Sequence, residues 1–135
     1  MKDEILTVKN SIATAEGAIA EAIQKGSRNL HGSRCLVLGY GTCGKTLVSY
    51  LTGMFCHVTV CARRPGIRAE AETLTGKAIA PEALKEHADS FDFIFNTIPA
   101  PILDRSLLKS LRKQALIIDI ASAPAFFNSF TIFRR

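Results

Sequence analysis

The chain has 135 residues, which fits one domain and no more, so a two-domain enzyme is not expected. Hydrophobic residues make up 47% and charged residues 21%, so the chain is able to bury a core and disorder is excluded as its main state. The formal net charge of +5 suits an anionic ligand or a nucleic acid without choosing between them.

Targeting and metal signals are missing from the sequence. Asp92 and Asp119 interrupt the longest apolar runs, which stay short of the roughly 20 residues that cross a bilayer. The acidic start lacks the basic and then apolar order of a secretion signal, so we expect a soluble, cytoplasmic protein. The four cysteines form no C-x-x-C pair and the histidines are not spaced near them as ligands, which predicts reduced thiols and no metal.

Hydrophobic periodicity predicts alternating helices and strands. Apolar residues at helical spacing indicate a helix over residues 14–25, with Thr14 as its N-cap and Gly26 and Ser27 at its end. A short apolar run over residues 35–38 is typical of a strand buried on both faces. Further along we expect helices over residues 44–54, 67–74, 81–87 and from the cap Asp104 to 113, and strands over 57–61, 77–80, 92–98 and 115–120.

This alternation predicts an α/β fold: a Rossmann-like, doubly wound parallel sheet in three layers, truncated to about five strands, with a preceding N-terminal helix. We divide the chain into a linker helix (1–30), a dinucleotide-binding domain (31–124) and an aromatic tail (125–135). In the strand order 3-2-1-4-5-6 a sixth strand is missing, so the strand over residues 115–120 should be an edge. That edge and the tail residues Phe126, Phe127, Phe130 and Phe133 predict a homo-oligomer.

A glycine motif follows the first strand. Gly39, Gly41 and Gly44 match the G-x-G-x-x-G fingerprint of dinucleotide binding, in the required context of a strand before and a helix after. The motif predicts a diphosphate site at the helix N-terminus, formed with Tyr40, Thr42 and Cys43. The alternative is a tight strand-to-helix turn without a ligand.

The end of the second strand bears on the choice of cofactor. NAD-specific folds place an acid there, about 20 residues after the motif, but this chain has Ala62, Arg63 and Arg64. Two guanidinium groups suit a 2′-phosphate, so we prefer NADP to NAD. The alternative is a solvated surface pair.

The loop after the fourth strand is a second candidate region. Asn96, Thr97, Ile98 and Pro99 lie where ligands of open α/β sheets bind, and they would contact a ribose or the nicotinamide unless they only end the strand. Asp119 and Ser122 hold the equivalent place on the next strand, with a weaker case for a role.

No catalytic residue follows from the spacing. Cys43 lies in the glycine motif at a helix N-terminus. It would be either a reactive thiol or, as we prefer, a small residue that fits into the loop. None of the three histidines has a recognisable catalytic partner, so the acid and base stay unknown. The basic residues form no aromatic-interleaved stripe, which argues against a nucleic-acid partner.

Five segments together resemble the nucleotide-binding half of the dipicolinate synthase A chain family. The segments are NSIATAEGAI (10–19), HGS (31–33), VLGYG (37–41), FNTIPA (95–100) and LIIDIAS (116–122), and the resemblance spans about residues 10–124. It implies an NADP-linked oxidoreductase component that acts on a small dihydrodipicolinate-type substrate during sporulation, together with the flavoprotein-like second subunit of that synthase. It also implies that the three glycines hold the diphosphate, that Arg63 or Arg64 holds the 2′-phosphate, that residues 96–99 face the nicotinamide, and that residues 10–16 lie near an interdomain cleft.

The chain also departs from that family. Its members carry an N-terminal domain before this region, further strands after it, and glycines where this chain has Ala125, Phe126 and Phe127. Because an active site between two domains needs both, we expect this chain to be inactive alone. The alternatives are a nucleotide-sensing regulatory module without catalysis, since a fold does not fix a function, and a module that serves only in assembly.

Overall fold

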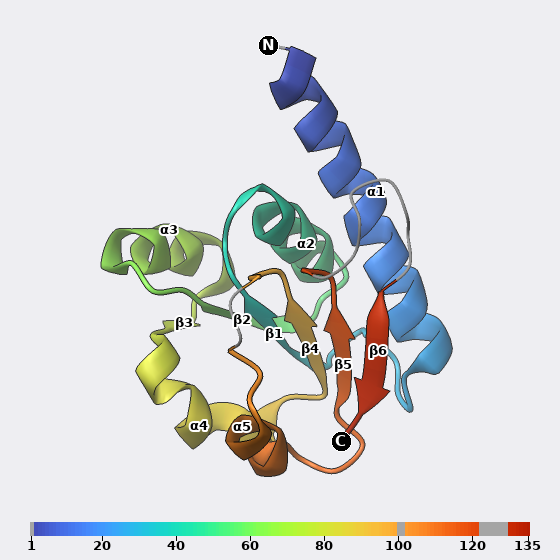
Figure 1. Cartoon of the computed structure of the whole chain (residues 1–135), viewed down its shortest axis with the longest axis vertical. Helices are drawn as coiled ribbons and strands as arrows, with labels where there is room; N and C mark the ends of the chain where they lie inside the picture. The colour runs from blue at the N-terminus through green and yellow to red at the C-terminus, as the bar shows by residue number, and fades with distance from the viewer. Residues whose placement is uncertain (1, 100–101, 122–129) are drawn as a thin grey trace.

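A six-stranded sheet with the order β3-β2-β1-β4-β5-β6 forms the centre of the molecule (Figure 1). The computed structural model describes residues 2–99, 102–121 and 130–135. The strands are β1 (Arg34–Leu38), β2 (His57–Cys61), β3 (Ala78–Ile79), β4 (Phe93–Asn96), β5 (Leu116–Asp119) and β6 (Thr131–Arg134). The helices are α1 (Lys2–Lys25), α2 (Thr42–Gly53), α3 (Pro65–Thr75), α4 (Leu84–His87) and α5 (Arg105–Ser110), with 3-10 turns η1 (Pro81–Ala83) and η2 (Ala88–Ser90).

The first five strands are parallel, and the register aligns their ends. Leu38 of β1 lies opposite Cys61 of β2 and Asn96 of β4, and Asn96 in turn lies opposite Asp119 of β5. The carboxyl ends of β2, β1, β4 and β5 therefore meet at one edge of the sheet. The predicted Rossmann-like α/β class with a preceding helix is confirmed, and its order of five parallel strands is the predicted one.

The prediction that β5 is an edge strand is wrong. Residues 131–134 form β6, which pairs antiparallel with β5 and places Phe133 opposite Ile117. The side chain of Phe130 packs against one face of the sheet and that of Phe133 against the other, so both are partly buried. Phe126 and Phe127 lie outside the described residues, as does Ser122.

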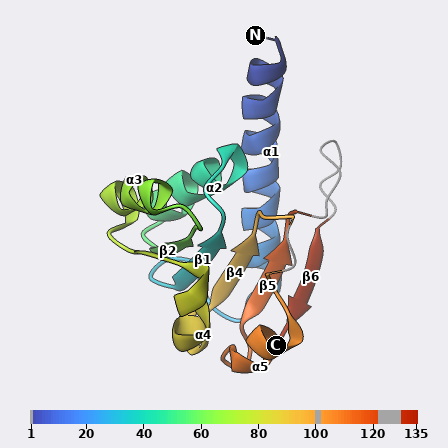
Figure 2. The same ribbon diagram turned by 60° about the vertical axis from the view of Figure 1, so that its left-hand side comes forward.

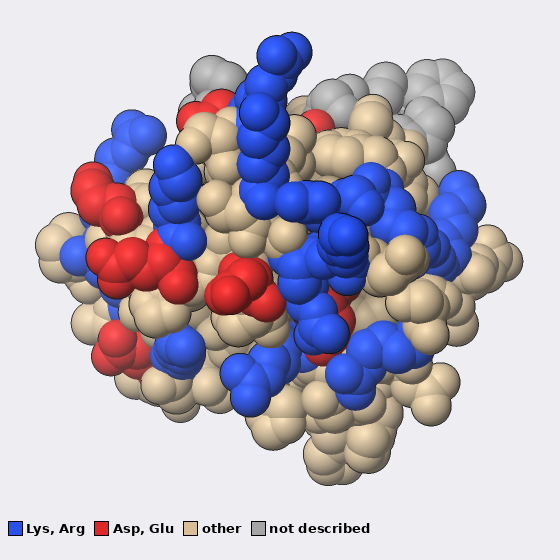
Figure 3. Space-filling model, turned by 90° about the horizontal axis from the view of Figure 1, so that it is seen from below, with Lys and Arg blue, Asp and Glu red and all other residues tan. Residues whose placement is uncertain are grey.

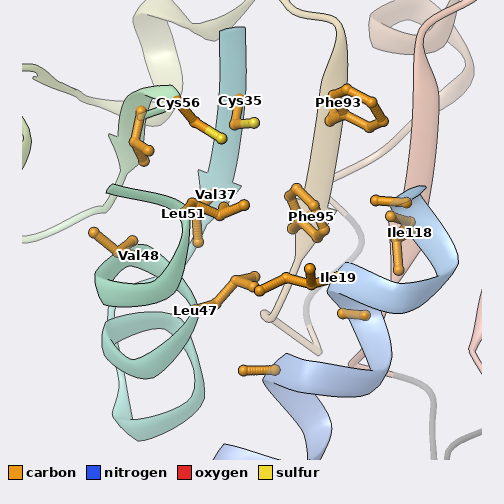
Figure 4. Close-up of a cluster of buried hydrophobic side chains, with 14 of the residues drawn as sticks. Ile19, Cys35, Val37, Leu47, Val48, Leu51, Cys56, Phe93, Phe95 and Ile118 are labelled. Carbon is orange, nitrogen blue, oxygen red and sulfur yellow. The ribbon is translucent and has the colours of Figure 1, made fainter. Parts of the chain in front are cut away.

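Alternation along each strand builds a separate core on each face. Cys35 and Val37 point to the face covered by α1, α2 and α3, whereas Leu36 and Leu38 point to the face covered by α4 and α5 (Figure 2). Figure 4 shows the first core, in which Ile19 of α1 and Leu47 of α2 approach Phe95 of β4. Because both faces are buried, the strands are continuously apolar, as parallel strands in this class of fold require.

Several helix boundaries differ from those predicted. α2 and α3 each begin two residues early, and the helix predicted over residues 81–87 is a 3-10 turn, η1, followed by the short helix α4. The largest differences lie in α1 and α5. α1 begins at Lys2, so Thr14 lies inside the helix and is not its N-cap. The first half of α1 extends beyond the sheet, and its apolar side chains Ile5, Leu6 and Val8 are exposed (Figures 1 and 2). At the other end of the chain, Asp104 caps α5 as predicted, with Oδ1 accepting a hydrogen bond of 2.7 Å from the N–H of Leu107.

The end of α5 also differs from its predicted position at residue 113. The helix stops at Ser110, so Arg112 and Lys113 do not lie in its last turn. Arg112 instead forms an ion pair with Asp92, in which its Nη1 donates to Oδ1 at 2.7 Å.

Candidate functional site

The loop between β1 and α2 is folded so tightly that two of its glycines have no room for a side chain. Gly39 has a φ of +101°, and a Cβ added there would lie 2.5 Å from Oγ1 of Thr97. A Cβ at Gly44 would lie 2.5 Å from the carbonyl oxygen of Gly39. These contacts explain why both positions require glycine: one makes the turn, and the other lets α2 pack directly on it.

Gly41 has a different environment. A Cβ there would meet no atom within 4 Å. Gly41 is the N-cap of α2 and offers no side-chain hydrogen bond, and the first intrahelical bond joins the N–H of Lys45 to the carbonyl oxygen of Gly41 at 2.8 Å. The amides of residues 42–44 therefore remain open at the positive end of the helix, which is the arrangement that binds phosphate.

Thr42 and Cys43 lie on that first turn of α2. Thr42 is exposed, and its carbonyl oxygen accepts a hydrogen bond of 2.9 Å from Oγ1 of Thr46. The Cys43 thiol is half-buried, and burial raises its pKa above the ordinary value. A raised pKa disfavours the nucleophilic thiolate, so the structure supports the interpretation of Cys43 as a small residue that fits the loop.

The end of β2 presents two unpaired cations. Arg63 and Arg64 are exposed, and neither guanidinium has a partner among the described residues. The preceding residue, Ala62, is buried and donates its N–H to the carbonyl oxygen of Ile79 at 3.1 Å. Nη1 of Arg68 donates to the carbonyl oxygens of Ala62 at 2.9 Å and Arg63 at 2.8 Å, so a third guanidinium fixes the backbone that carries the other two.

Three residues beside the glycine loop complete this side of the site. Nζ of Lys45 lies 3.2 Å from Oε1 of Glu70 and 5.6 Å from the centroid of the Tyr40 ring. Sequence reasoning included Tyr40 but missed Lys45, Glu70 and Arg68. The available signal was the position of Lys45 directly after Gly44 and of Arg68 in the first turn after the arginine pair.

The polar side chains at the end of β4 are bound to their own neighbours. Oγ1 of Thr97 donates to the carbonyl oxygen of Leu38 at 2.6 Å, which ties β4 to β1 next to Gly39. Nδ2 of Asn96 donates to Oδ1 of Asp119 at 3.2 Å and to the carbonyl oxygen of Ile98 at 3.1 Å, while Oδ1 of Asn96 accepts from the N–H of Ile98 at 3.1 Å. These bonds give Asn96 and Thr97 a role in shaping the loop, with Ile98 half-buried and Pro99 exposed at its rim.

The predicted site residues thus gather at one edge of the sheet, because β2, β1 and β4 are neighbours and end together. Within the described residues, the open amides of α2 and the guanidinium groups of Arg63 and Arg64 are available to an anionic ligand. In the described part of the chain, no cluster of three or more His, Cys, Asp or Glu side chains is placed to hold a metal ion. Likewise, none of the helices that the structure describes combines the length and apolar character needed to cross a bilayer.

Fold and site define this chain as a dinucleotide-binding domain of the Rossmann type. A family model described as the NAD binding domain of D-isomer specific 2-hydroxyacid dehydrogenases matches residues 6–126, and the chain belongs to that family. The predicted homology to the nucleotide-binding domain of the dipicolinate synthase A chain is also confirmed. That protein from Bacillus subtilis is 37% identical over 126 residues, which cover 91% of this chain and 41% of the relative.

Solved structures agree with this assignment. The dipicolinate synthase A chain from Bacillus subtilis superposes with a TM-score of 0.82 at 38% identity, covering 88% of this chain and 40% of that one. The corresponding protein from Bacillus halodurans gives 0.80 at 27% identity, covering 83% and 38%. A transhydrogenase from Sinorhizobium meliloti, with a TM-score of 0.70 at 19% identity over 84% and 39%, shares the fold alone. The chain spans about two fifths of the length of these relatives.

Proposed function

We propose that this chain binds NADP across the carboxyl edge of its sheet, as the cofactor-binding domain of an oxidoreductase that resembles the dipicolinate synthase A chain. The observation that carries the preference for NADP is a pair of guanidinium groups, on Arg63 and Arg64, that have no partner among the described residues and lie where NAD-specific folds place a carboxylate. Arg68 supports the proposal because it holds the carbonyl oxygens of Ala62 and Arg63 and so limits the motion of the loop.

The residues present fit a dinucleotide diphosphate. The open amides of α2 would bind the diphosphate, and the space beside Gly41 allows it to approach the backbone. Arg63 and Arg64 would bind the 2′-phosphate with charge-assisted hydrogen bonds. When bound, the cofactor supplies hydride transfer. The loop after β4 would lie beside the nicotinamide. Asn96 and Thr97 would hold this loop in place through their hydrogen bonds to Asp119 and to the carbonyl oxygen of Leu38.

Calorimetric titration with NADP and NAD tests this proposal. We expect NADP to bind more tightly, and we expect the double variant Arg63→Ala/Arg64→Ala to lower NADP affinity by at least about tenfold while changing NAD affinity by less than about twofold. The matched control is Lys109→Ala/Lys113→Ala, which removes the same charge at the opposite edge of the sheet. Equal affinity for the two cofactors, or equal losses in the two variants, would contradict the proposal.

We further propose that the reaction is hydride transfer with a dihydrodipicolinate-type substrate, in concert with a flavoprotein-like second subunit. The support is the homology to the dipicolinate synthase A chain, of which this chain spans about two fifths. We propose that the remainder of such a protein completes the substrate site, so this chain alone should show no turnover. Following NADPH formation from dihydrodipicolinate in the presence of the second subunit, for this chain alone and for this chain joined to the remaining part of a dipicolinate synthase A chain, separates the two functions. We expect turnover only in the joined protein, whereas nucleotide sensing predicts no oxidation in either.

A further inference from the structure

The edge of the sheet at which the parallel strands begin is strongly basic. Figure 3 views this face, and Lys and Arg side chains gather over one half of it while most of the acidic side chains in view lie on the other half. Two hollows open there, one on each side of the β5–β6 end. We call this surface, defined by the residues that line the two hollows, the underside. It is remote from the glycine loop, so a ligand there would not compete with a dinucleotide.

The first hollow has a volume of about 320 Å³ and is built around a buried carboxylate. Asp92 is 8% exposed, and its Oδ1 accepts from Nη1 of Arg112 at 2.7 Å while its Oδ2 accepts from Nη1 of Arg28 at 3.2 Å. The backbone N–H of Arg34 also donates to Oδ2, at 2.8 Å. One buried acid thus fixes two half-exposed guanidinium groups, and Lys113 adds a third cation to the lining.

The second hollow combines cations with an apolar floor. It has a volume of about 290 Å³, and the side chains of Leu108, Ile117 and Phe133 form the floor. The remaining lining residues are all basic: Arg105, Lys109, Arg134 and Arg135. An apolar group flanked by anionic groups is the ligand chemistry that matches such a lining.

Backbone contacts join the two hollows and hold their cations. Nη1 of Arg134 donates to the carbonyl oxygen of Gln114, a residue of the first hollow, and Nη2 of Arg134 donates to that of Lys25. Nη2 of Arg135 donates to the carbonyl oxygen of Lys109 at 2.8 Å. Cations that are already positioned lose less conformational entropy when a partner binds.

The underside accounts for the positive charge of the whole chain. Seven of the 17 basic residues line the two hollows, but of the 12 acidic residues Asp92 alone does so, which leaves ten basic and eleven acidic residues elsewhere. Five of the seven are arginines, which are less strongly hydrated than lysines and bind carboxylates in a bidentate manner. Arginine is also enriched, and lysine depleted, in protein–protein interfaces.

We propose that the underside is a docking surface for an acidic protein segment whose glutamate or aspartate side chains flank a large aliphatic one. The carboxylates bind the arginines of both hollows, and the aliphatic side chain occupies the floor formed by Leu108, Ile117 and Phe133. A nucleic acid fits less well, because its backbone supplies phosphates but no aliphatic group for this floor. The first hollow also lacks an exposed ring for base stacking, since Phe93 in its lining is buried.

Fluorescence anisotropy with a labelled synthetic peptide, glutamates around one central leucine, tests the proposal on the full chain. We expect saturable binding that weakens as salt is added, and weaker binding when serine replaces the leucine. The double variant Lys109→Glu/Lys113→Glu changes one exposed cation in each hollow and should lower the affinity by at least about tenfold. Urea unfolding of the variant checks that it is folded.

The matched control is Lys9→Glu/Lys77→Glu, which alters net charge equally at exposed positions outside both hollows. We expect it to change peptide affinity by less than about twofold. Three outcomes would overturn the proposal: no saturable peptide binding, equal losses in the two double variants, or tighter binding of a DNA duplex of the same net charge as the peptide. Because no readout of this test involves a dinucleotide, failure here is distinguishable from failure of the NADP proposal.

Discussion

The glycines of the β1–α2 loop separate the requirements of the fold from those of the ligand. Gly44 faces the backbone of Gly39, which is not able to move aside as a flexible side chain would. Gly41 has an ordinary φ of −80° and nothing near its Cβ position. Gly44 is therefore needed for packing, whereas no contact among the described residues explains a glycine at position 41.

Alanine substitutions should resolve this difference. Gly44→Ala places a methyl group 2.5 Å from a carbonyl oxygen, so α2 must shift, and we expect a loss of about 1–3 kcal/mol in the free energy of unfolding. Gly41→Ala should change stability by less than about 1 kcal/mol but lower dinucleotide affinity, because its methyl group enters the space of the diphosphate. Urea unfolding and calorimetric titration of both variants measure the two effects. A Gly41→Ala variant that binds NADP normally would argue against this position of the diphosphate.

Cys61 should make stability depend on pH in the alkaline range. The thiol is fully buried at the end of β2, and desolvation, with a contribution from Glu82, raises its pKa from 9.0 to about 11. Above pH 9 the unfolded chain ionises this thiol while the folded chain does not, so stability is complete below pH 9 and falls between about pH 9 and 11. The loss amounts to about 2 kcal/mol. Urea unfolding at several pH values should show a shallower alkaline decline for Cys61→Ala than for the parent chain, and identical slopes would refute the assignment.

At the level of elements, Asp92 joins the starts of three strands. Its N–H donates to the carbonyl oxygen of Arg34 at 2.8 Å, and its own carbonyl oxygen accepts from the N–H of Leu116 at 3.1 Å. Its carboxylate binds Arg28 before β1 and Arg112 before β5. One buried side chain thus connects β1, β4 and β5 with the loops that precede them.

Replacing this carboxylate should loosen that junction. Asp92→Asn keeps the size of the side chain but removes the charge that pairs with two guanidinium groups. We expect a loss of about 1–3 kcal/mol in the free energy of unfolding, below the cost of breaking a fully buried pair because both arginines are half-exposed. The matched control is Asp89→Asn, at an exposed position in η2, which should change stability by less than about 0.5 kcal/mol. Similar losses for the two variants in urea unfolding would exclude the proposed role of Asp92.

The sequence predicted strands correctly where apolar residues form a continuous run that the fold buries. Strands β1, β2, β4 and β5 are apolar runs between polar loops, and the structure places each within a few residues of its predicted range. β6 was missed because its four residues are half-buried at most, so tertiary pairing with β5 decides its conformation. The first half of α1 was missed because it lies beyond the sheet, where its apolar residues Ile5, Leu6 and Val8 are exposed.

Side-chain partners in the site were less predictable. The glycine spacing indicated the loop and the arginine pair indicated a phosphate, because each depends on residues close together in sequence. The bond from Asn96 to Asp119 joins two strands 23 residues apart, and spacing alone does not indicate which polar side chains will pair across a sheet. Arg68 binds backbone carbonyl oxygens, which leave no pattern in the sequence.

At the level of the whole molecule, one sheet carries two cores. Adjacent residues of each inner strand point to opposite faces, so no strand is able to leave one core without leaving the other. Cys35 belongs to the core beneath α1 and α2, and Cys61 belongs to the core beneath α4 and α5. Both thiols are fully buried, which makes them natural reporters of the two faces.

We therefore predict that the two faces unfold together. Brief alkylation at increasing urea concentrations, followed by mass spectrometry, should give the same midpoint for labelling of Cys35 and of Cys61, because each thiol becomes accessible only when the shared strands separate. Ile94→Ala and Phe95→Ala provide the sharper test, since these neighbours in β4 are both fully buried and lie in different cores. Each should lower the two midpoints equally, at a cost of about 2–5 kcal/mol. If Ile94→Ala exposed Cys61 at urea concentrations that still protected Cys35, the α4–α5 face would be a separate unfolding unit and the sheet would not couple the two cores.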